Sequence, residues 1–344
     1  MHDNENKNEA CLRKTAIYRY YLPMKLKPLF HHLVEFGIEA DLRPRKDIDK
    51  ILKKAKDRQK KLEGAEKELF DEERLWNPYP DSRIINGTGE EEVKTIIVGI
   101  DVETPELILV DHMNKGGAKI DAVMLHHPEG RALADLEKVM PIQIDVLHNV
   151  GVPENISEAQ LRPRMERIWR AIHADNLFRT ERAAELLKIP AFNCHTPADN
   201  FAMRFMEKTV CSKQFDSLGD VLNALLNISE YKEYARRGNP PILVNGSRSS
   251  RTGKIVATEF TGGTNGPEEF IEAQARAGVG TILTMHVTEK SLEKAKEHHV
   301  NFIQCSHMAS DNIGLNLILD QLMKKEKKLK VLEFSGFVRV KRGK

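Results

Sequence analysis

Short apolar runs alternate with segments of helical spacing from about residue 93 to the end of the chain. The apolar runs predict strands at residues 93–100, 122–125, 191–194, 255–260, 281–285 and 301–305. Apolar residues at helical spacing predict helices at residues 161–172, 179–187, 200–208, 218–226, 267–277, 291–299 and 313–325. This alternation is typical of an α/β fold with a largely parallel sheet, whose ligands gather at the carboxyl ends of the strands.

The first 90 residues follow a different pattern. Apolar residues recur at helical spacing from Leu26 to Gly37, where a glycine ends the run. Residues 45–74 form a charged helical stretch, which we expect to be a solvated face, with a docking surface for a partner as the alternative. Residues 77–89 are rich in helix breakers and predict a linker. We therefore expect an N-terminal helical extension and linker at residues 1–90 and an α/β domain at residues 91–344.

Composition narrows the classes of function. The 344 residues include 53 Lys and Arg against 51 Asp and Glu, so the chain lacks the overall basic field that non-specific nucleic-acid binding uses. Residues 1–10 are polar and acidic, which is unlike a secretory signal, and no apolar run approaches the length of a membrane span. The four cysteines show no CxxC spacing. We expect a cytoplasmic protein with reduced thiols and neither a membrane nor a nucleic-acid partner.

Four of the predicted strands run into histidine. His126 and His127 follow the strand at 122–125, His195 follows 191–194, His286 follows 281–285, and His307 follows 301–305 close behind. A single histidine in such a place is commonly a hydrogen-bonded core residue. Several separate segments with the same arrangement favour a shared metal site, because strand ends of one α/β protein meet.

Two of these histidines are followed by the same residues. His195 precedes Asp199, and His307 precedes Asp311, with an asparagine next in both cases. Each motif follows an apolar strand that holds a cysteine and leads into an amphipathic helix. The similarity predicts two related α/β halves around one pseudo-symmetric centre.

Imidazole and carboxylate ligands together suit divalent Zn, Fe, Mn or Co, and a carboxylate can bridge two ions about 3.5–4 Å apart. Capping of a helix N-terminus explains Asp199 and Asp311 equally well, since both stand where helices are expected to begin. The residues thus leave both alternatives open.

Four segments in this order resemble the motifs of the NIF-three-like family, whose members are often labelled GTP cyclohydrolase I type 2 homologues. They are residues 98–103, 123–128, 194–199 and 307–311, and the glycine-rich residues 260–264 resemble a turn of the same family. The resemblance covers residues 93–344. It implies a fold around a deep cavity that binds two divalent ions, and a homo-oligomer in the form of a ring-like hexamer.

The resemblance also implies a ligand set. Carried over position by position, the metal ligands are His126, His127, Asp199, His307 and Asp311. The last acid is usually Glu, and Thr284-Met285-His286 stands where the family has Thr-Gly-Glu. We therefore take His195, His286 and Glu289 as candidates for orienting the ligands or moving protons.

Three functions remain open. The first is a metal-dependent hydrolase acting on a nucleotide or another small molecule, in which the Gly262-Gly263 turn holds an anion or serves only as a structural turn. The second is a non-catalytic metal carrier, insertion factor or regulatory interaction protein that docks through residues 1–90. The third is a nucleic-acid-binding ring that uses the basic residues 339–344, and the balanced charge counts against it.

Overall fold

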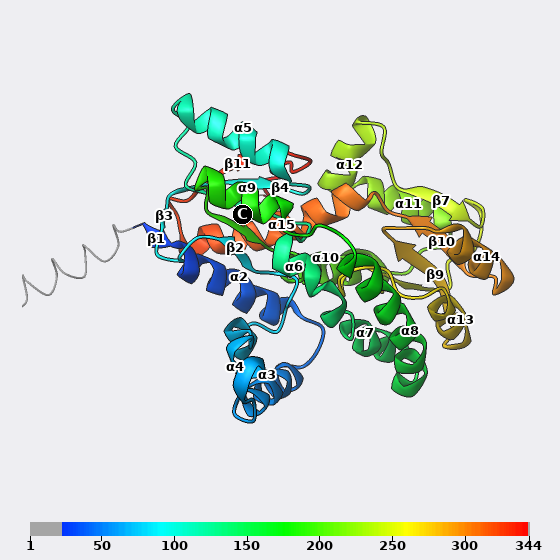
Figure 1. Ribbon diagram of the computed structural model, residues 1–344. Coiled ribbons are helices and arrows are strands. Elements are labelled where there is room, and N and C mark those ends of the chain that lie inside the picture. Colours follow the sequence, from blue (N-terminus) through cyan, green and yellow to red (C-terminus); the bar gives the residue numbers. More distant parts are fainter. Residues whose placement is uncertain (1–22, 343–344) are drawn as a thin grey trace, which may run out of the picture.

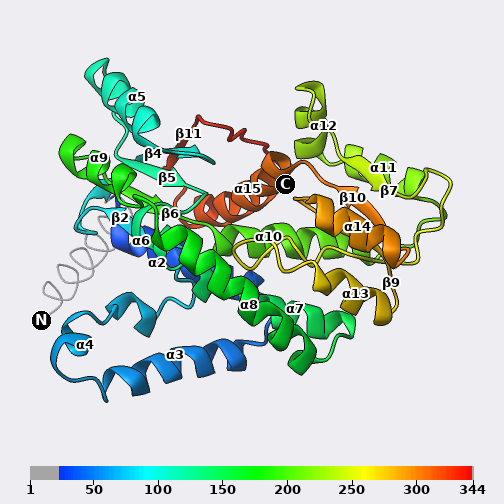
Figure 2. The ribbon, with the colours of Figure 1, turned by 45° about the vertical axis from the view of Figure 1, so that its right-hand side comes forward.

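The structure is a computed structural model that describes residues 23–342, and two β-sheets joined by a central pair of helices organise it (Figures 1 and 2). The first sheet has the order β11-β4-β5-β6-β2, with strands at Lys330–Glu333, Thr95–Gly99, Ala122–Leu125, Ala191–Asn193 and Ile84–Asn86. The second has the order β7-β10-β9-β8, with strands at Ile242–Asn245, Asn301–Gln304, Val279–Thr284 and Lys254–Val256. A two-stranded sheet pairs β1 (Met24–Lys25) with β3 (Glu92–Val93).

Both large sheets are parallel except at one edge. Strands β11, β4, β5 and β6 run parallel, and β2 joins β6 in the antiparallel sense. Strands β8, β9 and β10 run parallel, and β7 joins β10 in the antiparallel sense. The prediction of an α/β fold with largely parallel pairing is confirmed. The predicted strand at 255–260 is shorter than expected, because β8 ends at Val256.

Helices cover both faces of each sheet. In β4, Ile96 and Val98 face the main core, and Ile97 between them faces the layer that α5 (Thr104–Lys115) and α9 (Arg179–Leu187) form. The second sheet repeats this arrangement, with α13 (Glu269–Arg276) and α14 (Glu289–Glu297) on its outer face. Strands buried on both faces explain the continuous apolar runs in the sequence.

Two helices lie between the sheets, and both begin directly after strands that supply site residues. Helix α10 (Thr196–Met206) follows β6, and α15 (His307–Lys325) follows β10. Their residues pack in one core with side chains from both sheets. The crossing is close, because an added Cβ at Gly314 of α15 would lie 2.3 Å from the carbonyl oxygen of Ala198.

The N-terminal residues take part in the same core. Helix α2 (Leu26–Ala40) buries Leu26, Leu29, Phe30, Leu33 and Val34 against α10 and α15. The charged stretch divides into α3 (Arg45–Gln59), α4 (Gly64–Glu68) and the turn η1 (Glu72–Leu75), where a single helix was expected. Leu69, at the end of α4, is 80% exposed. The division of the chain at residue 90 stays a prediction.

The segment predicted to be a linker is instead ordered and buried. The Asn77 side chain closes a turn, because it accepts a hydrogen bond from the Tyr79 N–H (2.9 Å) and donates one to the Ser82 carbonyl (2.8 Å). Tyr79 donates to the buried Asp41 carboxylate at 2.8 Å. The helix-breaking residues correctly predicted a turn in this segment. The turn packs against the core, so the prediction of a linker is wrong.

The remaining helical elements surround these layers. They are α6 (Gly130–Ala134), η2 (Leu136–Lys138), α7 (Ile142–Val150), α8 (Glu154–His173), the π-helical turn η3 (Glu207–Cys211), α11 (Leu218–Leu226) and α12 (Ser229–Arg236). Within residues 23–342, no helix is both long enough and apolar enough to span a bilayer.

The close helix crossing gives a first prediction. Gly314→Ala must push α15 away from α10, so we expect the free energy of unfolding to fall by about 1–3 kcal/mol, despite the better helix propensity of alanine. Urea unfolding measures this change. Lys324→Ala, on the exposed end of the same helix, is the control and should change stability by less than about 0.5 kcal/mol. A Gly314→Ala variant as stable as the wild type would contradict the close packing.

Candidate metal centre

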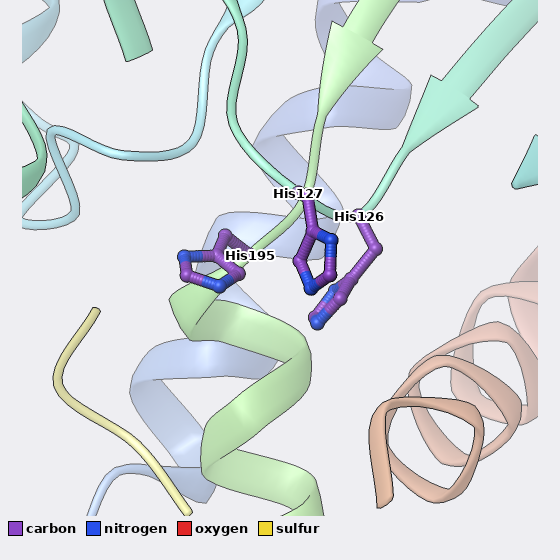
Figure 3. Close-up of side chains that lie close together, drawn as sticks. All are labelled: His126, His127 and His195. Atoms are coloured by element: carbon purple, nitrogen blue, oxygen red, sulfur yellow. The ribbon is translucent and has the colours of Figure 1, made fainter. Parts of the chain in front are cut away.

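Strand ends of both sheets meet at one point between α10 and α15. His126 and His127 follow β5, His195 follows β6 and serves as the N-cap of α10, and His307 is the first residue of α15. Figure 3 shows the rings of His126, His127 and His195 gathered beside the first turn of α10. The ring of His307 lies 5.2 Å from that of His127, measured between centroids.

The Nε2 atoms of these rings surround two carboxylates. The Asp311 Oδ1 atom lies 3.6 Å from His126 Nε2, and its Oδ2 atom lies 3.5 Å from His127 Nε2 and 3.4 Å from His307 Nε2. The Asp199 carboxylate lies 3.4 Å from His126 Nε2 and 3.7 Å from His195 Nε2. The cluster therefore brings together four histidines and two aspartates from both sheets.

These separations fit shared metal ligands better than hydrogen bonds. Hydrogen bonds between charged groups are usually about 2.7–2.9 Å long. Ligand atoms at the corners of a tetrahedron with bonds of about 2.05 Å stand about 3.3 Å apart. Three groups of three ligand atoms lie within 4.8 Å of one another and could hold an ion, and Asp311 belongs to two of these groups.

Several ligand atoms at the centre are buried without partners. Among the described residues, His126 Nε2 and both carboxylate oxygens of Asp311 have no hydrogen-bond partner and no exposure to solvent. Buried polar atoms are nearly always paired, so unpaired atoms that converge on one point need an explanation. Divalent cations bound among these atoms would satisfy them.

The Nδ1 atoms of His126, His127 and His195 each lie close to an oxygen atom that can orient the ring. His126 Nδ1 lies 3.1 Å from the Cys194 carbonyl, His127 Nδ1 lies 2.6 Å from Asp101, and His195 Nδ1 lies 2.8 Å from Asp81. Each of these oxygens can accept the Nδ1 proton, which leaves the lone pair of Nε2 facing the centre. This orientation is the one that a metal-binding imidazole needs.

Charge coupling in the cluster is strong in the absence of a cation. Burial lowers the pKa of His126, but Asp311 and Asp199 outweigh it and raise the pKa well above its ordinary value. Burial also opposes the charge on His127, yet the hydrogen bond to Asp101 and the nearby Asp311 carboxylate raise its pKa to about 9. Burial raises the pKa of Asp311, and His307 and His126 hold it well below its ordinary value.

Helix capping does not account for the two aspartates. The N-caps are His195 for α10 and Ser306 for α15, whose hydroxyl accepts from the Ala309 N–H. Asp199 and Asp311 instead stand about one turn inside their helices, and both are buried. The alternative of N-capping is therefore wrong, and the carboxylates point to the shared centre.

A cavity of about 230 Å³ opens beside the cluster. Its wall includes His127, His195, Asp199, His307 and Asp311, together with apolar side chains and residues that follow β8 and β9. His286 lies on this wall, with its ring centroid 4.1 Å from that of His307. Burial and the neighbouring His307 lower the pKa of His286 to about 4.

The structure corrects one prediction about this cavity and supports one of two alternatives for the glycine turn. Glu289 is the exposed first residue of α14 and does not line the cavity, so it is no candidate for proton transfer. The Gly262-Gly263 turn has positive φ at both glycines, and a Cβ at Gly262 would strike Gln143, whose side chain binds the Gly262 carbonyl at 2.9 Å. These contacts support the structural role of the turn.

Three residues of the site were missed in the sequence. Asp81 lies in the segment predicted to be a linker, and Asp101 follows β4 without a histidine beside it. Glu259 follows β8 and lines the cavity. Asp101 directly follows the predicted strand at 93–100, so a search of every strand end for acids as well as histidines would have found it.

Comparison with known proteins supports the resemblance at the level of the fold. No protein-family model matches the sequence, and no curated protein matches it. A crystal structure of a NIF3 superfamily protein from Sphaerobacter thermophilus superposes with a TM-score of 0.68 over 89% of this chain and 97% of that one, at 23% identity. The chain has the NIF3-type fold.

More distant structures are also similar. Reduced HcgD from Methanocaldococcus jannaschii is 12% identical, with a TM-score of 0.46 over 73% of this chain and 87% of that one. A Bacillus cereus protein related to NIF3 is 10% identical, with a TM-score of 0.38 over 76% of this chain and 96% of that one.

The charge coupling predicts a dependence of stability on pH. His127 has a pKa of about 9 in the folded, metal-free protein against 6.5 for an ordinary histidine. Its stabilising contribution is therefore fully present below about pH 6.5 and is lost as pH rises through about 9. Urea unfolding in the presence of a chelator should show wild type losing more stability than His127→Gln between these limits. Parallel losses in the two proteins would contradict the coupling.

Proposed function

We propose that this chain binds two divalent metal ions in the cluster and hydrolyses a small molecule held in the adjacent cavity. The observation that carries the proposal is the position of Asp311, whose two oxygens face different histidines. One oxygen approaches His126, which also approaches Asp199, and the other approaches His127 and His307. A bridging carboxylate of this kind suits a pair of ions about 3.5–4 Å apart.

The residues divide between the two proposed ions. His126 and Asp199 would bind the first ion, and His127 and His307 would bind the second. Asp311 would bind both ions. His195 was expected to act behind the ligands, but its Nε2 atom lies 3.7 Å from Asp199 and it belongs to one of the candidate ligand groups. We therefore propose that His195 either completes the first ion's ligands or takes a proton at Nε2, with Asp81 stabilising the charged ring.

Bound divalent ions would lower the pKa of water and polarise a substrate oxygen, which is the chemistry of metal-dependent hydrolysis. The chain's own residues support this use of the site. Asp81 orients His195 through Nδ1 and is itself fixed by the Thr196 hydroxyl at 2.6 Å. Leu133, Leu136 and Met285 line the cavity and reduce the access of bulk water to a bound ligand.

The size of the cavity limits the substrate. Its volume of about 230 Å³ is below the 300–1,000 Å³ that is common for drug-sized ligands. A nucleotide could place only one of its parts beside the cluster. We therefore favour a small phosphate- or amide-bearing molecule over a whole nucleotide as the group that is hydrolysed.

A second function has one observation in its favour. The side chains of His127 and His307 are 26% and 28% exposed, so one side of the cluster is open to exchange with solvent. Exchangeable ligands would suit a metal carrier or insertion factor with no turnover. Hydrolysis of any ester by the metal-loaded protein at a rate that falls with loss of metal would favour the enzyme instead.

Other expectations stay predictions. They are the ring-like hexamer, the cytoplasmic location and the absence of a nucleic-acid partner. The identity of the metal also stays open among Zn, Fe, Mn and Co, because imidazole and carboxylate ligands accept all four.

Metal content tests the proposal directly. Elemental analysis of protein loaded with Zn²⁺ or Mn²⁺ and then desalted should give about two ions per chain. Asp311→Asn should retain at most about one, because the amide can no longer bridge, and His307→Ala should lose the second ion. His112→Ala, an exposed histidine on α5, is the control and should keep both. Two ions retained by Asp311→Asn would show that Asp311 does not bridge.

A further inference from the structure

Glu259 occupies the third strand end of the second sheet. Strands β8, β9 and β10 are parallel neighbours, and their carboxyl ends lead to Glu259, His286 and His307 in that order. Adjacent strands lie about 4.8 Å apart, so two such spacings separate β8 from β10. All three residues line the cavity beside the cluster. Glu259 therefore stands on the far side of the cavity, with His286 between it and the candidate ligand His307.

The hydrogen bonds around Thr284 are compatible with a protonated Glu259. The Thr284 hydroxyl accepts from the His286 N–H at 3.2 Å and lies 2.8 Å from the His286 carbonyl, to which it can donate. It is also in close contact with the Glu259 carboxyl. The Thr284 hydroxyl has one proton to donate. If it donates this proton to the His286 carbonyl, a hydrogen bond between Thr284 and Glu259 requires that the Glu259 carboxyl be protonated and act as the donor. A neutral Glu259 satisfies all three contacts.

The charges near Glu259 agree with this reading. Burial raises the pKa of Glu259 to about 7, and the contact with Thr284 and the charge of Arg164 on α8 only partly oppose this rise. The adjoining His286 is neutral at pH values near 7, because its pKa is lowered to about 4. The remaining titratable residues of the cavity wall are His127, His195, Asp199, His307 and Asp311. These five residues belong to the candidate metal centre.

We propose that Glu259 is a catalytic proton donor that protonates the leaving group during hydrolysis. This inference rests on the proposed function. In the step, the bond between the central atom of the substrate and its leaving oxygen or nitrogen breaks, and a bond forms from the oxygen of water. The carboxyl proton of Glu259 passes to the leaving atom, and a water proton passes to His195. Return of that proton through solvent restores Glu259, so the sum is the addition of one water.

Leaving groups of different basicity test this role. A phenolate needs a proton more than a 4-nitrophenolate does. Glu259→Gln, loaded with Mn²⁺, should therefore lose about 10²–10⁴-fold in kcat on phenyl phosphate and much less on 4-nitrophenyl phosphate. Glu137→Gln removes another largely buried carboxyl, which does not line the cavity, and is the matched control that should leave both rates unchanged. Equal losses of kcat on the two esters would show that Glu259 does not protonate the leaving group, and this result would overturn the proposal.

Two further measurements do not depend on turnover. Infrared difference spectra between wild type and Glu259→Gln should show a protonated carboxyl near pH 6 that disappears as pH rises above about 7. Elemental analysis should show that Glu259→Gln keeps the full metal content. An absent carboxyl band, or loss of metal, would overturn the assignment as a proton donor. If wild type hydrolyses neither ester while the band is present, the proposed function fails, but Glu259 is still identified as a neutral acid.

Discussion

The structure depends on one buried carboxylate, that of Asp311, set among imidazoles from both sheets. A charged carboxylate removed from water is costly unless positive groups or hydrogen bonds compensate it. Asp311 is 1% exposed and has no hydrogen-bond partner within the described part of the chain, so only the surrounding rings or a bound cation can balance its charge. Three of these rings, those of His126, His127 and His195, are oriented by the contacts of their Nδ1 atoms with the Cys194 carbonyl, Asp101 and Asp81. The site is therefore preorganised for positive charge.

Packing far from the cavity fixes this geometry. Asp199 and Asp311 lie on α10 and α15, and their separation is set where Gly314 meets the backbone of Ala198. Helix α2 extends the same contact, because Gly37 packs against Pro197 and the Asn200 side chain donates to the Gly37 carbonyl at 3.2 Å. Residues near the N-terminus thus support the helix that carries Asp199. A small change in any of these contacts would move one carboxylate relative to the other.

Much of this arrangement could be predicted from sequence, for a physical reason. Strands buried on both faces give apolar runs, and their ends meet, so histidines after 122–125, 191–194 and 301–305 were correctly expected to converge. The edge strands β2, β7 and β11 were missed, since half-exposed strands lack such runs. Asp81 and Glu259 were missed because their roles depend on contacts with residues over twenty positions away, His195 and Thr284. Glu289 was named as a candidate after the comparison with the family's Thr-Gly-Glu motif, but it is the exposed first residue of α14.

The central claim is that two cations share the Asp311 carboxylate. X-ray absorption spectroscopy of the protein loaded with a single kind of metal measures this geometry without a substrate. We expect each metal ion to have a first shell of nitrogen and oxygen atoms at about 2.0–2.2 Å, with the multiple scattering of imidazole. We also expect a second metal ion at about 3.5–4 Å. A first shell of oxygen atoms alone, with neither imidazole nor a second metal, would contradict it.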